Sequence, residues 1–236
     1  MIDLFPIRLS LEVGLAALAA ILVPGCLLAW LQAHRKLVLP RLVDALLLVP
    51  LVLPPSVIGY LLVQLLSNRG PLSGVMSALG VEILLTPAAA VCASSVAAFP
   101  LLAKTLQPSF AAVPRGLEEV GASLGLSPLW VFLRITLPSA WKGLVAGCAL
   151  AFARAVGEFG ATLMVAGYVP GKTNTIPLEI YAAYQTGDHR RAAMYVAIML
   201  VFALVVSLVT SAWSDPASQR RPRARTSGRV SPRGGS

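Results

Sequence analysis

Charged side chains are scarce in this chain of 236 residues. Asp, Glu, Lys and Arg together make up 12% of it, whereas a soluble globular domain carries roughly 25%. Hydrophobic residues make up 57%, and the mean hydropathy is +0.78. A compact soluble protein needs a polar exterior, which these residues cannot supply. The composition therefore excludes a disordered chain and predicts that lipid is the solvent for most of the protein.

Cysteine and histidine are also rare. The three cysteines, Cys26, Cys92 and Cys148, sit in apolar runs without a short spacing. We therefore expect small buried side chains rather than a disulfide or a metal site. The two histidines, His34 and His189, have no sequence context that would indicate catalysis. A membrane enzyme is the weakest functional class for this chain.

Two short motifs resemble enzyme signatures but lack the required surroundings. Residues 121–125 fit G-x-S-x-G, but Ser123 falls within a helical pattern instead of between a strand and a helix. Residues 167–173 read GYVPGKT, one residue short of a P-loop, and they follow an apolar run. We expect no catalytic residue and no nucleotide site in this chain, so any ATP-driven movement requires a partner.

Five apolar segments are long enough to cross a membrane, since a helix needs about 20 apolar residues to span the hydrocarbon core. The predicted spans lie at about 11–33, 43–66, 83–104, 140–168 and 191–213. The first is too long for the apolar part of a signal peptide, so we expect it to be retained. The sequence thus predicts an all-α, polytopic membrane domain over 1–215, followed by a basic tail at 216–236.

Lysine and arginine predict the orientation, because cytoplasmic connections are rich in both. Together with the arginine-rich tail, one set of connections carries most of them: Arg35, Lys36, Arg41, Lys104, Arg115, Arg134 and Lys142. The other set carries fewer: Arg8, Arg69, Lys172, Arg190 and Arg191. We expect the N-terminus outside, the loop at 105–139 in the cytoplasm, and a disordered cytoplasmic tail that binds no nucleic acid.

The loop at 105–139 has the pattern of two short helices joined by a turn. Pro114 can begin the first helix, and Gly125 stands at the position after its end. Ser127 and Pro128 have the pattern of an N-cap and a first helical residue. The second helix is expected to run from Pro128 and to end at Pro138.

The first of these helices has one apolar stripe. Leu117, Val120 and Leu124 recur at i, i+3 and i+7. A helix lying on a membrane surface carries Lys and Arg on its polar face, but here Glu118 and Glu119 occupy the first turn, where carboxylates suit the helix dipole. The pattern favours a helix that docks in a groove of another protein.

Five residues of the loop match the spacing E-A-A-x3-G-x9-I-x-L-P: Glu119, Gly125, Ile135, Leu137 and Pro138. The chain here resembles the EAA loop of ABC importer permeases, although Val120 and Gly121 replace the paired alanines of that family. The resemblance implies a type I importer permease fold, with the loop seated in a cleft of a cytoplasmic ATPase. It assigns these residues to ATPase coupling: Glu118, Glu119, Gly121, Leu124, Gly125, Ile135, Leu137 and Pro138.

The second predicted span contains two consecutive prolines. Pro54 and Pro55 lack amide hydrogens and interrupt the helical hydrogen bonds. In lipid the freed carbonyl groups need partners, so such a break is tolerated only against protein or a wet cavity. It either lines a transport path or bends the helix to fit its neighbours.

The fourth predicted span carries Arg154 and Glu158 near its middle, where a charge costs about 3 kcal/mol. Since they are four residues apart, we expect them to share one helix face and to pair. Such a pair either supports the structure or acts in gating.

Seven residues are candidates for the path or gate: Pro54, Pro55, Ser56, Tyr60, Arg154, Glu158 and Thr162. Further donors or outer charges are Ser94, Ser95, Lys172, Arg190 and Arg191.

Residues 50–60, 152–162 and 170–181 look like the molybdate permeases among these importers. The resemblance implies a molybdate importer subunit, multi-pass in a bacterial cytoplasmic membrane, that binds no cofactor itself. Its implied partners are a second permease copy, two ATPase subunits that hold ATP and Mg, and an extracytoplasmic molybdate-binding protein. Two alternatives stay open: a permease for sulfate, thiosulfate or another oxyanion, and a passive channel or non-transporting membrane anchor.

Overall fold

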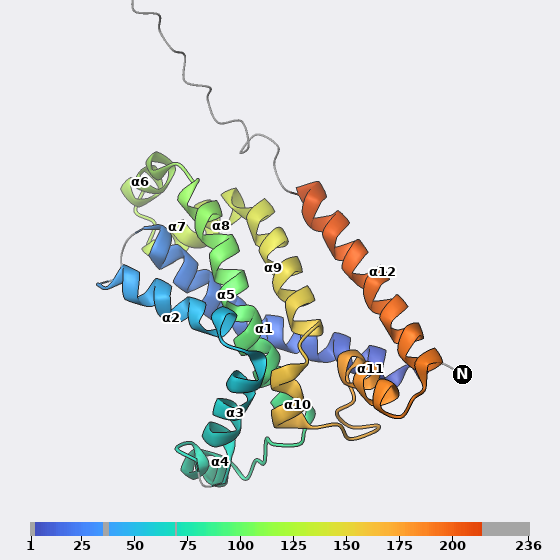
Figure 1. Ribbon diagram of the computed structural model, residues 1–236. Coiled ribbons are helices and arrows are strands. Elements are labelled where there is room, and N and C mark those ends of the chain that lie inside the picture. The colour runs from blue at the N-terminus through green and yellow to red at the C-terminus, as the bar shows by residue number, and fades with distance from the viewer. Residues whose placement is uncertain (1–2, 35–37, 69, 214–236) are drawn as a thin grey trace, which may run out of the picture.

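The computed structural model describes residues 3–34, 38–68 and 70–213. Arg35, Lys36 and Arg69, which enter the orientation argument, and the predicted tail at 216–236 lie outside the described residues. Within the described ranges the chain consists of helices and connecting loops, without a strand (Figure 1). The prediction of an all-α fold is confirmed.

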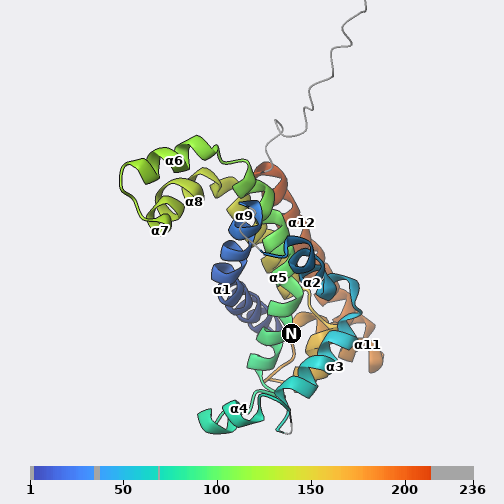
Figure 2. The same ribbon diagram turned by 90° about the vertical axis from the view of Figure 1, so that its left-hand side faces the viewer.

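The longest helices are α1 (Phe5–Ala33), α5 (Pro87–Ala111), α9 (Trp141–Val156) and α12 (His189–Trp213). The shorter ones are α2 (Pro40–Val52), α3 (Pro55–Leu66), α4 (Ser73–Leu79), α6 (Arg115–Ser123), α7 (Pro128–Val131), the π-helix η1 (Phe132–Thr136), α8 (Leu137–Ser139), α10 (Gly160–Ala166) and α11 (Ile176–Gln185). We call the projecting unit formed by α6, α7, η1 and α8 the hairpin. It lies at the same end of the molecule as the end of α12, and α4, α10 and α11 lie at the opposite end (Figures 1 and 2).

Helices α1, α5 and α9 form the core through small side chains. Buried alanines, among them Ala17, Ala98 and Ala151, lie where these helices pack together. Gly143 and Gly147 of α9 face Ser109 and Leu106 of α5 at short range. Small residues let helix backbones approach closely in a membrane, where the hydrophobic effect does not drive helices together.

Among the described residues, three helices are each long and apolar enough to cross a membrane, namely α1, α5 and α12. Two further pairs pass that test only together: Pro40–Val52 with Pro55–Leu66, bent by 106°, and Pro128–Ser139 with Trp141–Val156, bent by 80°. Counting each bent pair as one span gives up to five. The chain is therefore a multi-pass membrane protein in which straight spans and sharply bent ones alternate.

The predicted span at 43–66 is not one rod but two helices that meet almost at a right angle. Leu53 has ψ 141°, and Pro54 has φ −54° and ψ 138°, so two successive residues are extended. A proline disfavours the helical conformation of the residue before it, and here that rule applies twice. The sequence identified the break but not the size of the bend.

The predicted span at 140–168 is not one continuous helix either. Helix α9 ends at Val156, and α10 begins at Gly160 after a break at 157–159. The two breaks in the fold touch each other: a Cβ atom added at Gly160 would lie 2.8 Å from the Cβ of Pro55. Helices α3 and α10 continue side by side from this point toward the opposite end (Figure 1).

Gly59 is the residue that brings α3 against α10. A Cβ atom added there would lie 2.6 Å from the Cβ of Met164 and 3.0 Å from the Cα of Ala161. We predict that Gly59→Ala separates the two helices and destabilises the protein by about 1–3 kcal/mol, the usual range for overpacking. Gly74→Ala in α4 is the matched control, because nothing lies within 4 Å of its added Cβ.

Thermal unfolding of both variants in detergent measures this difference. The Gly74→Ala variant should have the same melting temperature as the unaltered protein. Equal melting temperatures for all three proteins would contradict the close contact.

Candidate functional site

The hairpin turns at Gly125, as its position in the sequence predicts. Gly125 has φ +84°, in the left-handed region that favours glycine. The amide of Leu126 donates to the carbonyl of Gly121, and that of Gly125 to the carbonyl of Ala122, at 3.2 and 3.0 Å. These two bonds close α6 as a Schellman motif and reverse the chain toward α7.

The second arm of the hairpin is longer than predicted. Helical structure runs without interruption from Pro128 to Ser139, so Pro138 does not end it. The turn before Pro138 is a π-helix, in which the amide of Leu137 bonds to Phe132, five residues back. A wider turn avoids the clash between the proline ring and the carbonyl four residues earlier.

The inner side of the hairpin holds the two arms together. Gly121 is buried against Ile135, and a Cβ atom added at Gly121 would collide with the end of that side chain. Leu137 is half-buried on the same arm. The resemblance assigned all three to coupling, and the structure places them where they fix the shape of the hairpin.

The outer side of the hairpin is apolar and exposed. The predicted stripe faces away from the bundle, with Leu117 50%, Val120 59% and Leu124 78% exposed. Glu119 is exposed beside these residues. Leu129 and Trp130 add to the exposed apolar surface of the second arm. Large apolar side chains grouped in this way are typical of an interaction surface.

Glu118 differs from its neighbour Glu119, because its side chain points into the protein. One carboxylate oxygen lies 2.8 Å from Nε2 of His34, and the other accepts a hydrogen bond from the hydroxyl of Thr136. The resemblance placed Glu118 with the ATPase-coupling residues. The structure instead places it between the hairpin and the end of α1.

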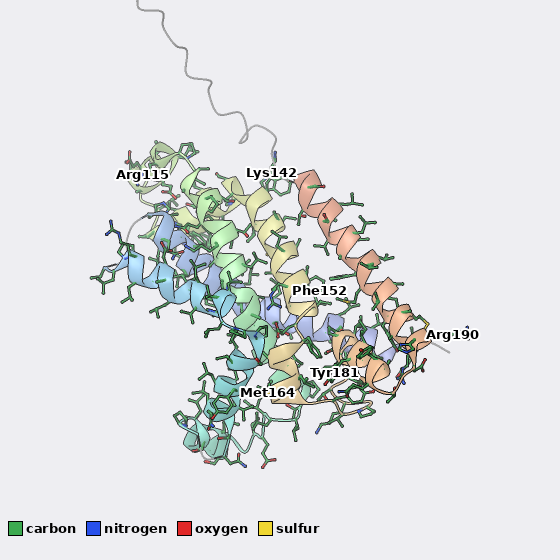
Figure 3. The ribbon with its side chains drawn as sticks, in the orientation of Figure 1. Arg115, Lys142, Phe152, Met164, Tyr181 and Arg190 are labelled. Atoms are coloured by element: carbon green, nitrogen blue, oxygen red, sulfur yellow. The ribbon has the colours of Figure 1, made fainter. Side chains whose placement is uncertain are left out.

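The candidate path residues divide into an exposed and a buried group. Pro54, Pro55, Ser56 and Tyr60 are exposed at the start of α3, whereas Thr162 is buried on α10. Pro55 and the backbone of Ser56 lie against Gly160 at the second break. Figure 3 shows Arg115 and Lys142 at the hairpin end, Arg190 at the opposite end, and the apolar side chain of Phe152 between these ends.

Arg154 and Glu158 do pair, at 2.7 Å between Nη1 and Oε2. They do not share a helix face as predicted, because Glu158 lies in the break after α9. Its other oxygen accepts the amide of Ala161 at 2.9 Å. The buried carboxylate thus joins the last turn of α9 to the first turn of α10, and both of its oxygens are satisfied.

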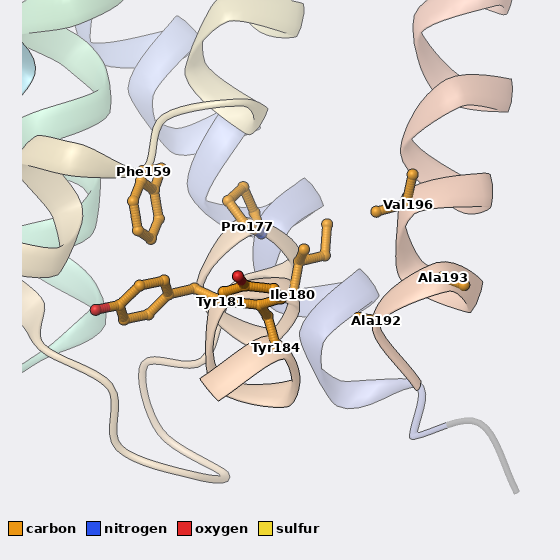
Figure 4. Close-up of a pocket in the computed structure, with 8 residues that line it drawn as sticks. All are labelled: Phe159, Pro177, Ile180, Tyr181, Tyr184, Ala192, Ala193 and Val196. Carbon is orange, nitrogen blue, oxygen red and sulfur yellow. The ribbon is translucent and has the colours of Figure 1, made fainter. Parts of the chain in front are cut away.

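An apolar groove of about 500 Å³ lies between α11 and α12, beside the second break (Figure 4). It is lined by Phe159, Pro177, Ile180, Tyr181, Tyr184, Ala192, Ala193 and Val196. None of these was predicted as a path residue. The lining suits an apolar chain rather than an oxyanion, because an anion out of water needs several hydrogen-bond donors.

Residues 21–221 match the family described as binding-protein-dependent transport system inner membrane component. The chain belongs to this family. Proteins of the family are transport subunits, not ATPases, and they work with ATPase and binding-protein partners. The chain is therefore a permease subunit.

The permease resembles proteins named molybdenum transport system permease protein ModB. It is 35% identical over 216 residues to that of Escherichia coli, covering 91% of the permease and 94% of the relative. It is 37% identical over 198 residues to that of Mycobacterium tuberculosis, covering 84% and 75%. A probable sulfate transport system permease of Nephroselmis olivacea is 32% identical over 207 residues, covering 87% and 72%.

Two solved structures have the same fold. The inward-facing MetNI methionine ABC transporter matches with a TM-score of 0.60 and 18% identity, covering 89% of the permease and 95% of that chain. An amino acid ABC transporter matches with a TM-score of 0.52 and 20% identity, covering 86% and 90%. The prediction of an ABC importer permease fold is confirmed.

Sequence reasoning missed a buried polar cluster at the opposite end of the permease. Glu179 of α11 is fully buried, accepts hydrogen bonds from Tyr168 and Asn174 at 3.1 Å each, and pairs with Arg191 of α12. Burial and the Glu179 carboxylate raise the pKa of the Tyr168 phenol, which keeps it a neutral donor. Of the predicted outer charges, Arg191 is paired with Glu179, whereas Lys172 is exposed. A single acidic residue in an apolar helix was the available signal.

A second missed cluster joins three helices near the hairpin. Lys104 of α5 donates to Asp44 of α2 at 2.5 Å, and Gln32 of α1 donates to the same oxygen at 2.7 Å. The sequence placed Lys104 at the edge of a loop, but α5 continues to Ala111. The ammonium group of Lys104 therefore extends from helix α5 to Asp44 of α2.

The buried ion pair predicts an asymmetric response to substitution. Arg154→Met leaves the buried Glu158 carboxylate without its cation, and we expect a loss of about 3 kcal/mol in unfolding free energy. The double variant Arg154→Met/Glu158→Gln removes the charge and keeps the acceptor for Ala161. It should therefore be more stable than the single variant.

Denaturant unfolding in detergent measures the unfolding free energies of the single and the double variant. Arg8→Met is the control, because the pair Arg8–Glu12 has the same spacing but lies exposed, so its loss should have little effect. If the Arg154→Met variant is as stable as the double variant, the Arg154–Glu158 pair does not stabilise the break between α9 and α10.

Proposed function

We propose that this permease is the membrane subunit of an ATP-driven molybdate importer. Proteins named as molybdenum transport permeases match it over nearly the whole chain, at 35% identity for the Escherichia coli relative. In this function the chain forms the translocation path and has no ATPase site of its own. ATP and Mg bind to the partner ATPase, and the permease needs no cofactor.

One observation supports the coupling part of this proposal more than any other, namely the outward face of the hairpin. Leu117, Val120 and Leu124 lie in water in the isolated chain, although each gains about 2 kcal/mol when it is buried. A cleft on a cytoplasmic ATPase would cover them, with Glu119 at the same contact. Gly121, Gly125, Ile135, Leu137 and Pro138 then give the hairpin the shape that the cleft receives.

Two copies of the permease would enclose the path. An oxyanion such as molybdate cannot enter hydrocarbon, because burial without partners is far too costly. Ser56 and Tyr60 present hydroxyl groups on the exposed side of α3, where a second copy would complete a polar channel. The adjoining breaks at Pro55 and Gly160 are where this path would change its width.

The orientation follows the positive-inside rule. The hairpin and the tail would face the cytoplasm of a bacterium, and the N-terminus and the loop after α10 would face outward, toward an extracytoplasmic molybdate-binding protein. ATP binding would draw the two ATPases and their hairpins together and open the path outward. Hydrolysis would return it to the inward-facing form.

Sulfate is the second candidate cargo, because a probable sulfate permease is 32% identical over 87% of the chain. Radiolabelled molybdate uptake in bacteria lacking this subunit distinguishes the two. Expression of the chain should restore uptake, and excess sulfate should leave it largely intact. Strong competition by sulfate would reassign the cargo, and uptake that continues without an ATPase partner would indicate a passive channel.

Gly125 provides a direct test of coupling. Its positive φ is unfavourable for valine, so Gly125→Val should distort the hairpin and lower molybdate uptake by about tenfold, while the amount of subunit in the membrane stays the same. Gly187→Val is the matched control, since Gly187 has φ +76° and open space around it but lies outside the hairpin. Normal uptake by the Gly125→Val variant would contradict the coupling role.

A further inference from the structure

One carboxylate connects three separate segments of the permease. Glu118 belongs to α6, its oxygen Oε1 accepts from the hydroxyl of Thr136 in the second arm of the hairpin, and Oε2 lies 2.8 Å from His34 at the end of α1. The Glu118 side chain is only 15% exposed. Both oxygens are therefore occupied inside the protein.

His34 is held in place from both sides of its ring. Nδ1 lies 2.9 Å from the carbonyl of Trp30, and Nε2 faces the Glu118 carboxylate. Both partners are acceptors, and a ring nitrogen that carries a proton donates to the acceptor that it faces.

Aromatic rings pack beside this polar contact. The ring centroids of Trp30 of α1 and Phe132 of η1 lie 5.9 Å apart, and those of Phe132 and Phe110 of α5 lie 5.8 Å apart. Both pairs are edge to face. Trp30 also contacts the His34 ring at 4.9 Å. Edge-to-face aromatic pairs have a defined geometry, so the hairpin is fixed to α1 by both polar and apolar contacts.

The other end of α1 is attached to the outer helices. Ser10 accepts the amide of Ile176 at the start of α11 at 2.7 Å, and the Tyr195 hydroxyl of α12 donates to the carbonyl of Asp3 at 2.9 Å. With 29 residues, α1 is about 43 Å long. It links the hairpin to the part of the permease at the opposite end.

We propose that Glu118 and His34 form the joint that passes displacement of the hairpin to α1. This inference rests on the proposed function. Glu119 contacts the ATPase, whereas Glu118 is a positioning residue that keeps the hairpin and α1 moving as one body. Both of its oxygens face internal partners and its side chain is only 15% exposed, so it offers a partner protein little surface.

Reconstituted complexes of the permease with its ATPase and binding protein test this division. The measurement is the amount of molybdate transported per ATP hydrolysed. The Glu118→Ala variant should keep its ATPase and continue to hydrolyse ATP, with transport per ATP lowered roughly tenfold, the effect of losing a charged hydrogen bond. Glu119→Ala should instead weaken co-purification of the ATPase.

Glu118→Gln should restore most of the transport per ATP, because its amide can donate to a neutral His34 and still accept from Thr136. Such a rescue separates the geometry of the joint from its charge. Loss of the ATPase from the Glu118→Ala complex, or unchanged transport per ATP, would overturn the proposal. If the unaltered complex transports no molybdate, the proposed function fails instead.

Discussion

The structure depends on the requirement that every backbone polar group in lipid finds a partner within the protein. A continuous helix meets it automatically, but this chain contains two interruptions, at Pro54 and at 157–159. The fold places the two interruptions against each other, and Glu158 accepts the amide hydrogen of Ala161, one of those that the start of α10 leaves without a helical partner. Because the interruptions are fixed by mutual contact, α3 and α10 cannot be displaced independently.

The hairpin shows how neighbouring residues of one motif take different roles. Glu118 and Glu119 are adjacent and chemically identical, yet one is bonded within the protein and the other is exposed. The helical repeat of 3.6 residues separates their directions by about 100°. The same repeat buries Gly121 between the arms and exposes Val120. A short motif therefore combines an outward contact surface with the internal bonds that hold it in position.

Local signals predicted the elements of this fold, whereas contacts between distant residues were beyond them. The apolar runs, the turn at Gly125 and the outward stripe through Val120 each depend on residues a few positions apart. The partners of Glu179 and of His34 lie on other helices, and no spacing in the sequence indicates them. The predicted end of the second arm at Pro138 was wrong, because a π turn accommodates this proline within the helix. The functional assignment of the coupling residues relied on family resemblance.

Helix α12 touches the rest of the molecule along a narrow line that includes Tyr195 and Phe202, while Leu200, Leu204 and Leu208 stay exposed. The uncharged part of α12, residues 192–213, is about 33 Å long, slightly more than the roughly 30 Å of the hydrocarbon layer. The excess length makes the inclination of α12 a function of bilayer thickness. Lipids with longer or shorter acyl chains will therefore act first on this helix, and through Arg191 on the buried carboxylate of α11.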